Sequence, residues 1–503
     1  MVLVKLNEKD PRPIYTQICD QIRPLIDRGT LKAGYRLPAT RLLADRLGVD
    51  RSTVCRAYEE LWAMGYVESR PGSYTTVRRR MAIALPSETP AGALVDWGKV
   101  CSRPARRLYD DCVGLKARVP SRHRAGTIEF TKLAADYNLC PVDEFRACVR
   151  DVLAERGKDI LAYGDPAGYR PLREAIAHRM QTHGVAVMAD EILITNGAQQ
   201  AVELVLKLLT SPGASIVVES PTYALVLPLF RFYGLDLKQV PMRDDGLDLE
   251  VLERILKRSR PAFVYTVPNF HNPTGISTSH VHRERLLALC QAHRVPVVED
   301  GFEEEMKYFG KVVLPIKSMD RHKLVIYLGT FSKIVFPGLR IGWIAAAREC
   351  IDRLAAIHRY SNLSNSNLGQ VAMHRFYTAG HYEKHVRRIH RAYRKRMQTM
   401  LTAIRRHFPT EGVAWTEPSG GYTLWVECRR PGISEDALVR ELAERGVGVS
   451  PGSVFFPDRQ TLDGKARRGS DVCFRLSCAN LSEREIEEGI RRLGRGLEDI
   501  LER

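Results

Sequence analysis

The chain has 503 residues, 44% of them hydrophobic and 27% charged, with a formal net charge of +17. This length predicts two or three domains, and the lack of any apolar run of about 18–20 residues argues against a membrane span. The eleven cysteines include no C-x-x-C pair, and the first residues contain no secretory hydrophobic region. We therefore expect a soluble cytoplasmic protein with reduced thiols, no metal site and no membrane partner.

The positive charge is concentrated towards the N-terminus. Residues 1–78 carry 13 Lys and Arg against 9 Asp and Glu, and residues 79–126 carry 10 against 4. About a quarter of the chain thus holds more than half of the excess charge. By itself this distribution fits a solvated basic surface as well as it fits nucleic-acid binding.

The first 78 residues show the pattern of a winged helix-turn-helix. Apolar periodicity predicts three helices, over Ile14–Ile26, Thr40–Leu47 and Arg51–Met64. Pro24 should kink or shorten the first helix, and Asp50 is placed to cap the third. A tight turn at Gly48 joins the last two helices, and two short strands around Pro71–Gly72 predict a β-wing.

Polar side chains on the last two helices favour DNA contact over a plain three-helix core. Arginine suits guanine edges and phosphates, and serine and threonine suit phosphate oxygens. The first turns of the third helix lie where a recognition helix meets the major groove. The side chains expected to contact DNA are Arg41, Arg51, Ser52, Thr53 and Arg56.

Residues 12–78 resemble the winged-helix domain of GntR-type regulators. The stretch LPATRLLADRLGVDRSTVCRAYEELWAMGYVESRPGS carries the family's Leu-Pro, Leu-Gly-Val, Arg-x-Thr-Val, Ala-Tyr, Gly-Tyr and Gly-Ser elements. The resemblance implies operator DNA as a partner and adds Gly72 of the wing to the contacting residues. Tyr74 stands where the family usually has a second wing glycine, so we expect a reshaped wing tip.

Residues 79–126 are expected to form a basic interdomain linker, because their periodicity is weak and they contain four prolines. The linker is not expected to be a simple tether. Its arginines are either solvated or contact phosphates, and its apolar residues favour partial docking onto one domain. Those apolar residues are Trp97, Leu108, Tyr109, Val113 and Leu115.

From about Thr127 to Arg503, helical patterns alternate with short apolar runs such as SIVVES, AFVYTVP and KLVIYLGT. Strands separated by helices indicate an α/β fold with a mostly parallel central sheet. Ligands of such sheets lie at the carboxyl ends of the strands.

Several of these strand ends carry side chains that can bind a ligand or take part in a reaction. ILITNGAQQ leads into a helix whose first N–H groups, at 197–199, form an anion site. SPTY offers the ring of Tyr223, NPTG the amide of Asn272, VPVVED the carboxylate of Asp300, and GTFSK the amine of Lys333. Pyridoxal 5′-phosphate (PLP) requires this set, since a lysine forms the Schiff base and a carboxylate keeps the pyridine nitrogen protonated.

The region 127–503 resembles fold-type I aminotransferases, which have a smaller C-terminal subdomain. The resemblance implies that Lys333 is the catalytic Schiff-base lysine and that Arg475 in FRLS grips a substrate α-carboxylate. It also implies that Tyr163 reaches the phosphate in a neighbouring subunit, hence a homodimer. The implied cofactor ligands are Lys333, Asp300, Asn272, Tyr223, Ala198, Gln199, Thr330, Ser332, Arg340 and Tyr163.

One position departs from the family pattern. The family commonly reads Glu-Asp-x-Tyr, and its tyrosine hydroxyl bonds the ring oxygen of the cofactor, but EDGF places Phe302 there. We expect the cofactor still to bind. The missing hydrogen bond makes rapid transamination doubtful.

A GntR-type winged helix joined to an aminotransferase-like domain resembles the MocR-type regulators. The resemblance implies a dimeric, DNA-binding transcriptional regulator whose large domain senses PLP or an amino compound through aldimine chemistry. The alternative is an active PLP-dependent aminotransferase that carries an accessory DNA-binding domain.

Overall fold

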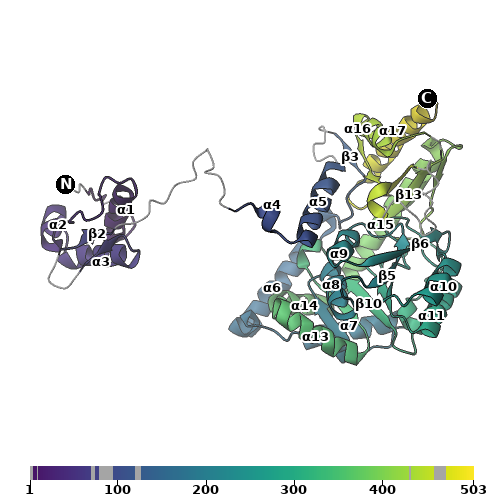
Figure 1. Cartoon of the computed structure of the whole chain (residues 1–503), viewed down its shortest axis with the longest axis horizontal. Coiled ribbons are helices and arrows are strands. Elements are labelled where there is room, and N and C mark those ends of the chain that lie inside the picture. The colour runs from purple at the N-terminus through teal and green to yellow at the C-terminus, as the bar shows by residue number, and fades with distance from the viewer. Residues whose placement is uncertain are drawn as a thin grey trace. The chain divides into compact units, whose positions relative to one another are not determined.

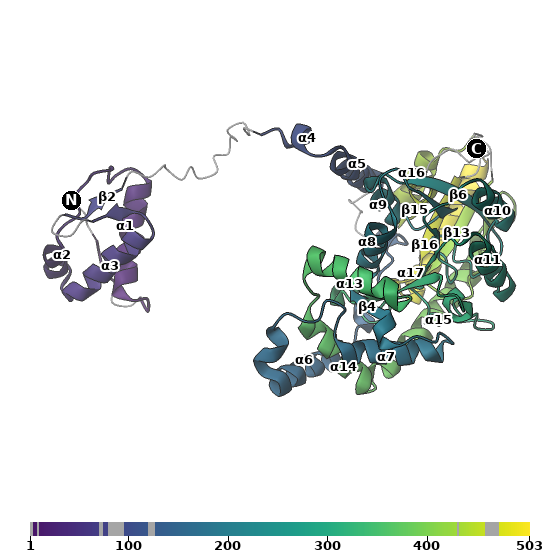
Figure 2. The same cartoon turned by 60° about the horizontal axis from the view of Figure 1, so that its bottom comes forward.

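A computed structural model gives the fold (Figure 1; Figure 2). It divides into two compact units, residues 1–100 and 101–503. No helix among the residues described is long and apolar enough to cross a bilayer. The structure describes residues 4–7, 10–69, 74–78, 95–118, 126–429, 432–457 and 472–502.

The N-terminal unit contains the expected winged helix. Its elements are α1 (Ile14–Asp27), α2 (Thr40–Leu47), α3 (Arg51–Ala63), β1 (Val67–Glu68) and β2 (Thr76–Val77). The two strands pair antiparallel and form the wing. α1 continues past Pro24 and is not shortened there. Asp50 caps α3, because its side chain accepts a hydrogen bond from the Ser52 backbone N–H at 2.7 Å.

Two helices lie within the predicted linker, α4 (Trp97–Val100) and α5 (Arg103–Arg118). α5 packs against α9 (Val226–Phe232). The Asp111 carboxylate accepts a hydrogen bond from Arg231 Nε of α9 at 3.1 Å. Trp97 and Tyr109 nevertheless remain 73% and 69% exposed, so the described part of the chain does not cover them.

The second unit is built on an eight-stranded sheet in the order β4-β11-β10-β9-β8-β5-β6-β7. Strands β10, β9, β8, β5 and β6 run parallel, and β4, β7 and β11 join them through antiparallel pairs. This is the mostly parallel sheet that the sequence predicts. The strands are β4 (Ile192–Thr195), β5 (Ser215–Ser220), β6 (Asp236–Arg243), β7 (Gly246–Leu247), β8 (Val264–Thr266), β9 (Val297–Asp300), β10 (Val325–Thr330) and β11 (Gly342–Ala345).

Continuous apolar runs form the central strands because helices cover the sheet and leave no strand face in water. Every residue of β4, β8, β9, β10 and β11 is buried. In both views α10 and α11 lie side by side near β6 (Figure 1; Figure 2). The helices are α6 (Val142–Arg156), α7 (Arg170–Thr182), α8 (Ala198–Leu209), α9, α10 (Leu249–Arg258), α11 (His280–His293), α12 (Ile316–Met319), α13 (Arg348–Asn362), α14 (Asn367–Thr378) and α15 (His381–His407).

The C-terminal part forms a smaller four-stranded antiparallel sheet in the order β12-β13-β16-β15. The 27-residue helix α15 packs against α17 beside it. An early strand, β3 (Ile128–Glu129), pairs with β14 and so ties the start of this unit to its end. The elements are β12 (Val413–Trp415), β13 (Thr423–Cys428), α16 (Glu435–Glu444), β14 (Val447–Gly448), β15 (Ser450–Pro451), β16 (Val472–Ser477) and α17 (Glu483–Glu502).

Candidate functional site

The side chains predicted to contact DNA lie mainly on the surface of α2 and α3. Arg41, Arg51, Ser52 and Arg56 are exposed, and Thr53 is half-buried. Two of the arginines are partly oriented by neighbours. Arg51 Nε donates to Thr40 Oγ1 at 3.4 Å, and the Arg56 guanidinium lies 4.2 Å from the Tyr15 ring centroid. Gly72, also predicted to contact DNA, lies outside the described residues.

The carboxyl ends of the parallel strands converge on a cavity of about 140 Å³. With the exception of Tyr163, every predicted cofactor ligand lines it. These residues are Ala198, Gln199, Tyr223, Asn272, Asp300, Thr330, Ser332, Lys333 and Arg340. Phe302 lines the same cavity.

One end of the cavity presents groups suited to a phosphate. Gly197 precedes α8 with a φ of 82°, and a Cβ at this position would lie 2.6 Å from Arg340 Nη2. The guanidinium therefore sits directly against the start of α8. Thr330 Oγ1 donates to Ser332 Oγ at 3.0 Å, beside this position. Backbone N–H groups of a helix start, an arginine and two hydroxyls form an anion site.

The Asp300 carboxylate is buried, with 3% of its surface exposed. Its Oδ2 accepts a hydrogen bond from the Tyr265 hydroxyl at 2.7 Å, whereas Oδ1 has no hydrogen-bond partner among the described residues. Burial raises the pKa of Asp300 to about 6. A buried carboxylate with an unpartnered oxygen calls for a donor, and a protonated pyridine nitrogen would supply one. The residues present therefore fit PLP.

Lys333 follows β10, and its Nζ donates to the Leu133 carbonyl at 2.5 Å. The Tyr422 hydroxyl donates to the Lys333 carbonyl at 2.8 Å and fixes the backbone. Burial lowers the pKa of Lys333, an effect that the nearby Glu303 carboxylate opposes. A lowered pKa increases the fraction of neutral amine, the form that attacks a carbonyl carbon.

Arg475 on β16 does not itself line the cavity, but it bonds a residue that does. Its Nη1 donates to Asn272 Oδ1 at 3.0 Å. Its Nη2 donates to the Thr131 carbonyl at 2.7 Å and to Ser450 Oγ at 3.1 Å. Burial lowers the pKa of Arg475 to about 10, and its Nε has no hydrogen-bond partner in the described part of the chain. The Nε–H remains available to a carboxylate.

Tyr163 lies outside the cavity and is 84% exposed. It follows the short 3₁₀ helix at Gly157–Leu161. Within one chain it contributes nothing to the cofactor cavity.

Sequence reasoning missed two residues that support this cavity. Tyr265 lies in the strand motif AFVYTVP, which indicates only an apolar strand, and its hydroxyl donates to Asp300. Glu303 belongs to an acidic run, EEE, typical of solvated surface, yet it is fully buried. Its Oε2 accepts from the Tyr422 backbone N–H at 3.3 Å, and burial raises its pKa to about 8. No local sequence signal distinguishes Glu303 from an exposed glutamate.

A buried polar network holds the loop that carries Asn272. Glu219 at the end of β5 accepts from Thr266 Oγ1 at 2.6 Å, and its Oε2 lies 3.1 Å from His271 Nε2. The other ring nitrogen of His271 lies 2.7 Å from Thr274 Oγ1. Since both Glu219 and His271 are 1% exposed, this network fixes the loop from both sides of Asn272.

Comparison with known proteins agrees with this geometry. Residues 14–77 match the family of bacterial regulatory proteins, gntR family, and residues 131–493 match aminotransferase class I and II. The uncharacterized HTH-type transcriptional regulator YdfD of Bacillus subtilis is 30% identical over 98% of both chains. The probable rhizopine catabolism regulatory protein MocR of Rhizobium meliloti is 28% identical over 96% of this chain and 93% of its own length.

Among solved structures, LysN, the α-aminoadipate aminotransferase of Thermus thermophilus, is 32% identical with a TM-score of 0.72. The match covers 81% of this chain and all of LysN, whose structure holds N-(5′-phosphopyridoxyl)-L-leucine. The second unit therefore has the fold-type I aminotransferase architecture and a PLP site. This chain belongs to the aminotransferase class I and II family and, because a GntR winged helix precedes that domain over a full-length match, it is a PLP-domain DNA-binding regulator of the MocR type.

Proposed function

We infer that this regulator senses PLP, or an amino compound that reacts with PLP, and that it acts in the cytoplasm as a homodimer. The observation that carries the proposal is the cavity that Lys333, Asp300 and Arg340 line together, in which Phe302 replaces the expected tyrosine. The cavity can hold the cofactor, but it lacks a hydroxyl suited to rapid turnover.

The cavity residues divide into groups according to the part of PLP that each would hold. Arg340, the hydroxyls of Thr330 and Ser332, and the N–H groups of Ala198 and Gln199 would hold the phosphate. Asp300 would hold the ring nitrogen, Asn272 the ring oxygen, and Tyr223 the ring face. When bound, PLP supplies an aldehyde that links to amines and a ring that accepts electrons.

The protein's own groups prepare Lys333 for this chemistry. Lys333 must lose a proton before its Nζ can act as a nucleophile. Glu303 is a buried carboxylate whose pKa is raised to about 8, and the charge of Lys333 is the largest influence that opposes the rise. The Glu303 carboxylate raises the pKa of Lys333, and we propose that protonation of Glu303 removes this influence and favours the neutral Lys333 amine. Arg475, with its free Nε–H, would orient an α-carboxylate but would have no partner in a simple amine.

Tyr163 is 84% exposed and does not line its own cofactor cavity, which supports a homodimer in which its side chain would reach the cavity of a second copy of the chain. Two winged helices on one dimer would gain affinity for a paired operator through effective concentration. A ligand that binds two arrangements of the dimer unequally would change that affinity.

The second candidate function is a working aminotransferase with an accessory DNA-binding domain. The similarity to LysN over the whole of that enzyme and the retention of Lys333, Asp300 and Arg475 favour it.

One experiment separates the two functions. Operator affinity and transamination are measured on the same preparation, with and without PLP and amino ligands, for wild type and Phe302→Tyr. A sensor gives slow wild-type turnover and a ligand-dependent operator affinity. Fast wild-type turnover together with an operator affinity indifferent to every amine and to PLP would establish the enzyme instead.

A further inference from the structure

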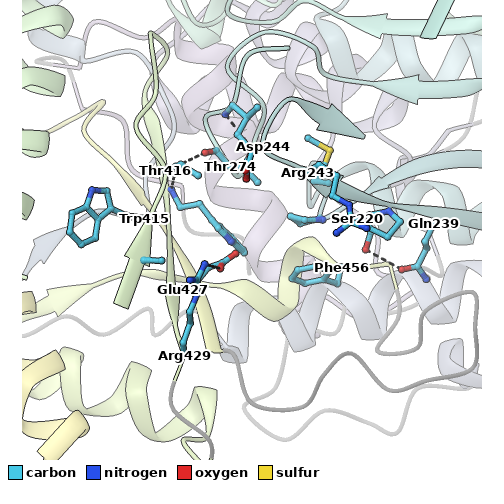
Figure 3. A pocket seen from close by; sticks show the side chains of 16 residues that line it. Ser220, Gln239, Arg243, Asp244, Thr274, Trp415, Thr416, Glu427, Arg429 and Phe456 are labelled. Atoms are coloured by element: carbon cyan, nitrogen blue, oxygen red, sulfur yellow. Dashed lines mark hydrogen bonds and ion pairs between the residues drawn. The ribbon is translucent and has the colours of Figure 1, made fainter. Parts of the chain in front are cut away.

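A second and larger cavity, of about 340 Å³, lies between the main sheet and the small C-terminal sheet (Figure 3). Residues at the ends of β5 and β6 form one wall, and residues of β12 and β13 form the other. Its volume is at the lower end of the roughly 300–1,000 Å³ typical of small-molecule sites. None of the side chains assigned to the cofactor lines it.

This second cavity and the cofactor cavity share two loops. At the end of β5, Ser220 and the following Pro221 line the second cavity, and Tyr223 lines the cofactor cavity. After β8, Asn272 lines the cofactor cavity, whereas Thr274 lines the second cavity. Because the two cavities share these loops, a ligand that moves a loop in one cavity can also move residues that line the other.

An aromatic contact links the second cavity to Arg475. Trp425 and Phe456 line the cavity with their ring centroids 6.3 Å apart. Trp425 also meets Phe455 edge-on at 5.8 Å, and the Arg475 guanidinium lies 5.1 Å from the Phe455 centroid. The Phe455 ring thus contacts both Trp425 of the cavity wall and the guanidinium that we assign to carboxylate binding.

The small sheet also contacts the loop that carries Asn272, on the side of the second cavity. Thr416 Oγ1 donates to the Thr274 carbonyl at 2.6 Å and accepts from the Trp425 backbone N–H at 3.0 Å. Gly275 packs so closely that a Cβ there would lie 2.5 Å from the Thr423 carbonyl. A change in the relative position of the two sheets would therefore shift the loop that carries Asn272.

The charges around the second cavity indicate a zwitterionic ligand. Each wall carries one cation and one anion, Arg243 and Asp244 from one side and Arg429 and Glu427 from the other. Arg243 forms an ion pair with Asp248 at 2.9 Å. Among the residues that the structure describes, the Arg429 side chain has a single ion pair, with Glu427 at 3.4 Å, and it is 60% exposed. Asp244 has no ion pair among the described residues. Figure 3 shows Asp244 and Arg429 on opposite sides of the cavity.

We propose that this cavity is a second ligand site, which binds an apolar α-amino acid and couples its occupancy to the cofactor cavity. Asp244 binds the ammonium group, Arg429 binds the carboxylate, and the side chain of the ligand packs against Met242 and Phe456. The balance of charge disfavours a phosphate or nucleotide, which the carboxylates of Asp244 and Glu427 would repel. Binding at this site does not depend on the sensing function proposed above.

The binding test uses holoprotein in which borohydride has reduced the cofactor, so that the cofactor cavity can no longer react with amines. L-phenylalanine is the probe, titrated by calorimetry. N-acetyl-L-phenylalanine, which lacks the ammonium, and L-phenylalaninamide, which lacks the carboxylate, should bind at least tenfold more weakly. If borohydride attaches no cofactor, the sensing proposal loses its support and the same titration is made on cofactor-free protein.

Substitutions test whether the amino acid binds in the second cavity. Asp244→Asn and Arg429→Met should each weaken L-phenylalanine binding at least tenfold, and Met242→Trp should abolish it by filling the cavity. Arg405→Met is the matched control, because Arg405 is 56% exposed and paired with Glu417 at 2.8 Å but does not line the cavity. The assignment is overturned by the absence of saturable binding, by equal binding of all three probes, or by binding that survives these substitutions.

The coupling test measures the affinity of cofactor-free protein for 4′-deoxypyridoxine 5′-phosphate, which has no aldehyde and cannot react with amines. Saturating L-phenylalanine should change this affinity at least threefold in wild type but not in Arg429→Met. An equal change in both proteins would mean that the amino acid enters the cofactor cavity. An unchanged affinity in wild type would show that the two cavities are not coupled.

Discussion

The winged helix and the cofactor cavity differ in whether the polar groups that bind the ligand are exposed or buried before it arrives. On α3, Arg51, Ser52 and Arg56 are exposed, so their charges and hydroxyls are already hydrated without a ligand. In the cavity, Asp300 and Asn272 are 3% and 1% exposed, and one oxygen of Asp300 has no partner. The first surface costs the fold little, whereas the second leaves buried charge uncompensated until a cofactor arrives.

This difference predicts how substitutions behave in each region. A change on α3 should alter DNA binding and leave stability almost unchanged. A change in the cavity should alter both cofactor binding and stability, and the two effects can have opposite signs. The following experiments test this contrast, from the largest expected effect to the smallest.

Lys333→Ala should abolish covalent attachment of the cofactor. Wild-type protein treated with PLP and borohydride should gain the mass of one reduced cofactor per chain at Lys333, located by peptide mass spectrometry. Lys323→Ala is the control, because Lys323 is 61% exposed and should not carry the label. Attachment at any other lysine would contradict the assignment.

Asp300→Asn should weaken PLP binding but stabilise the cofactor-free protein. The pKa of Asp300 is raised from 3.8 to about 6 in the fold, so the wild type loses stability as pH rises from about 4 to 6. The variant has no such loss and should be more stable by about 3 kcal/mol at pH 7.5, with little difference at pH 4.

The measurement is the denaturant midpoint of cofactor-free protein at both pH values. Asp143→Asn is the control for replacing a carboxylate by an amide at the surface, because the Asp143 side chain is 81% exposed. An equal stability difference at the two pH values would mean that titration of Asp300 is not its cause.

Arg51→Ala should weaken operator binding by about 1–3 kcal/mol if Arg51 contacts a base edge. If it contacts a phosphate, binding to all sequences should weaken alike and the salt slope should fall by about one. The thermal midpoint should not change, because among the described residues the Arg51 side chain makes a single long hydrogen bond, to Thr40 Oγ1 at 3.4 Å. Arg28→Ala, at an exposed arginine after α1, serves as the control. A truncation to residues 127–503 that still bound the operator would contradict the assignment.

Phe302→Tyr should have a small effect on stability. Phe302 is 9% exposed and lines the cavity, so the added hydroxyl can face the bound cofactor. The visible absorption of the bound cofactor should change its pH dependence, and transamination should accelerate. An unchanged pH titration of the absorption would show that the hydroxyl does not reach the cofactor.

Local patterns account for the parts of this molecule that could be predicted from sequence. The helices of the winged helix follow from apolar periodicity, and the cap at Asp50 follows from one side chain next to its own helix. The parallel-sheet rule brings Tyr223, Asn272, Asp300 and Lys333 to one edge, and they line one cavity. For each of them the backbone direction of its strand is enough to give its position.

Contacts between distant segments were decided by the tertiary structure. Arg475 meets Asn272 across 203 positions of the chain, and the second cavity lies where two sheets face one another. Glu303 is buried because Tyr422 and its neighbours close over it, although its own sequence context resembles a surface run. Periodicity records which face of an element is apolar. It does not record the angle and distance at which two elements pack, and these determine which polar groups share a buried space.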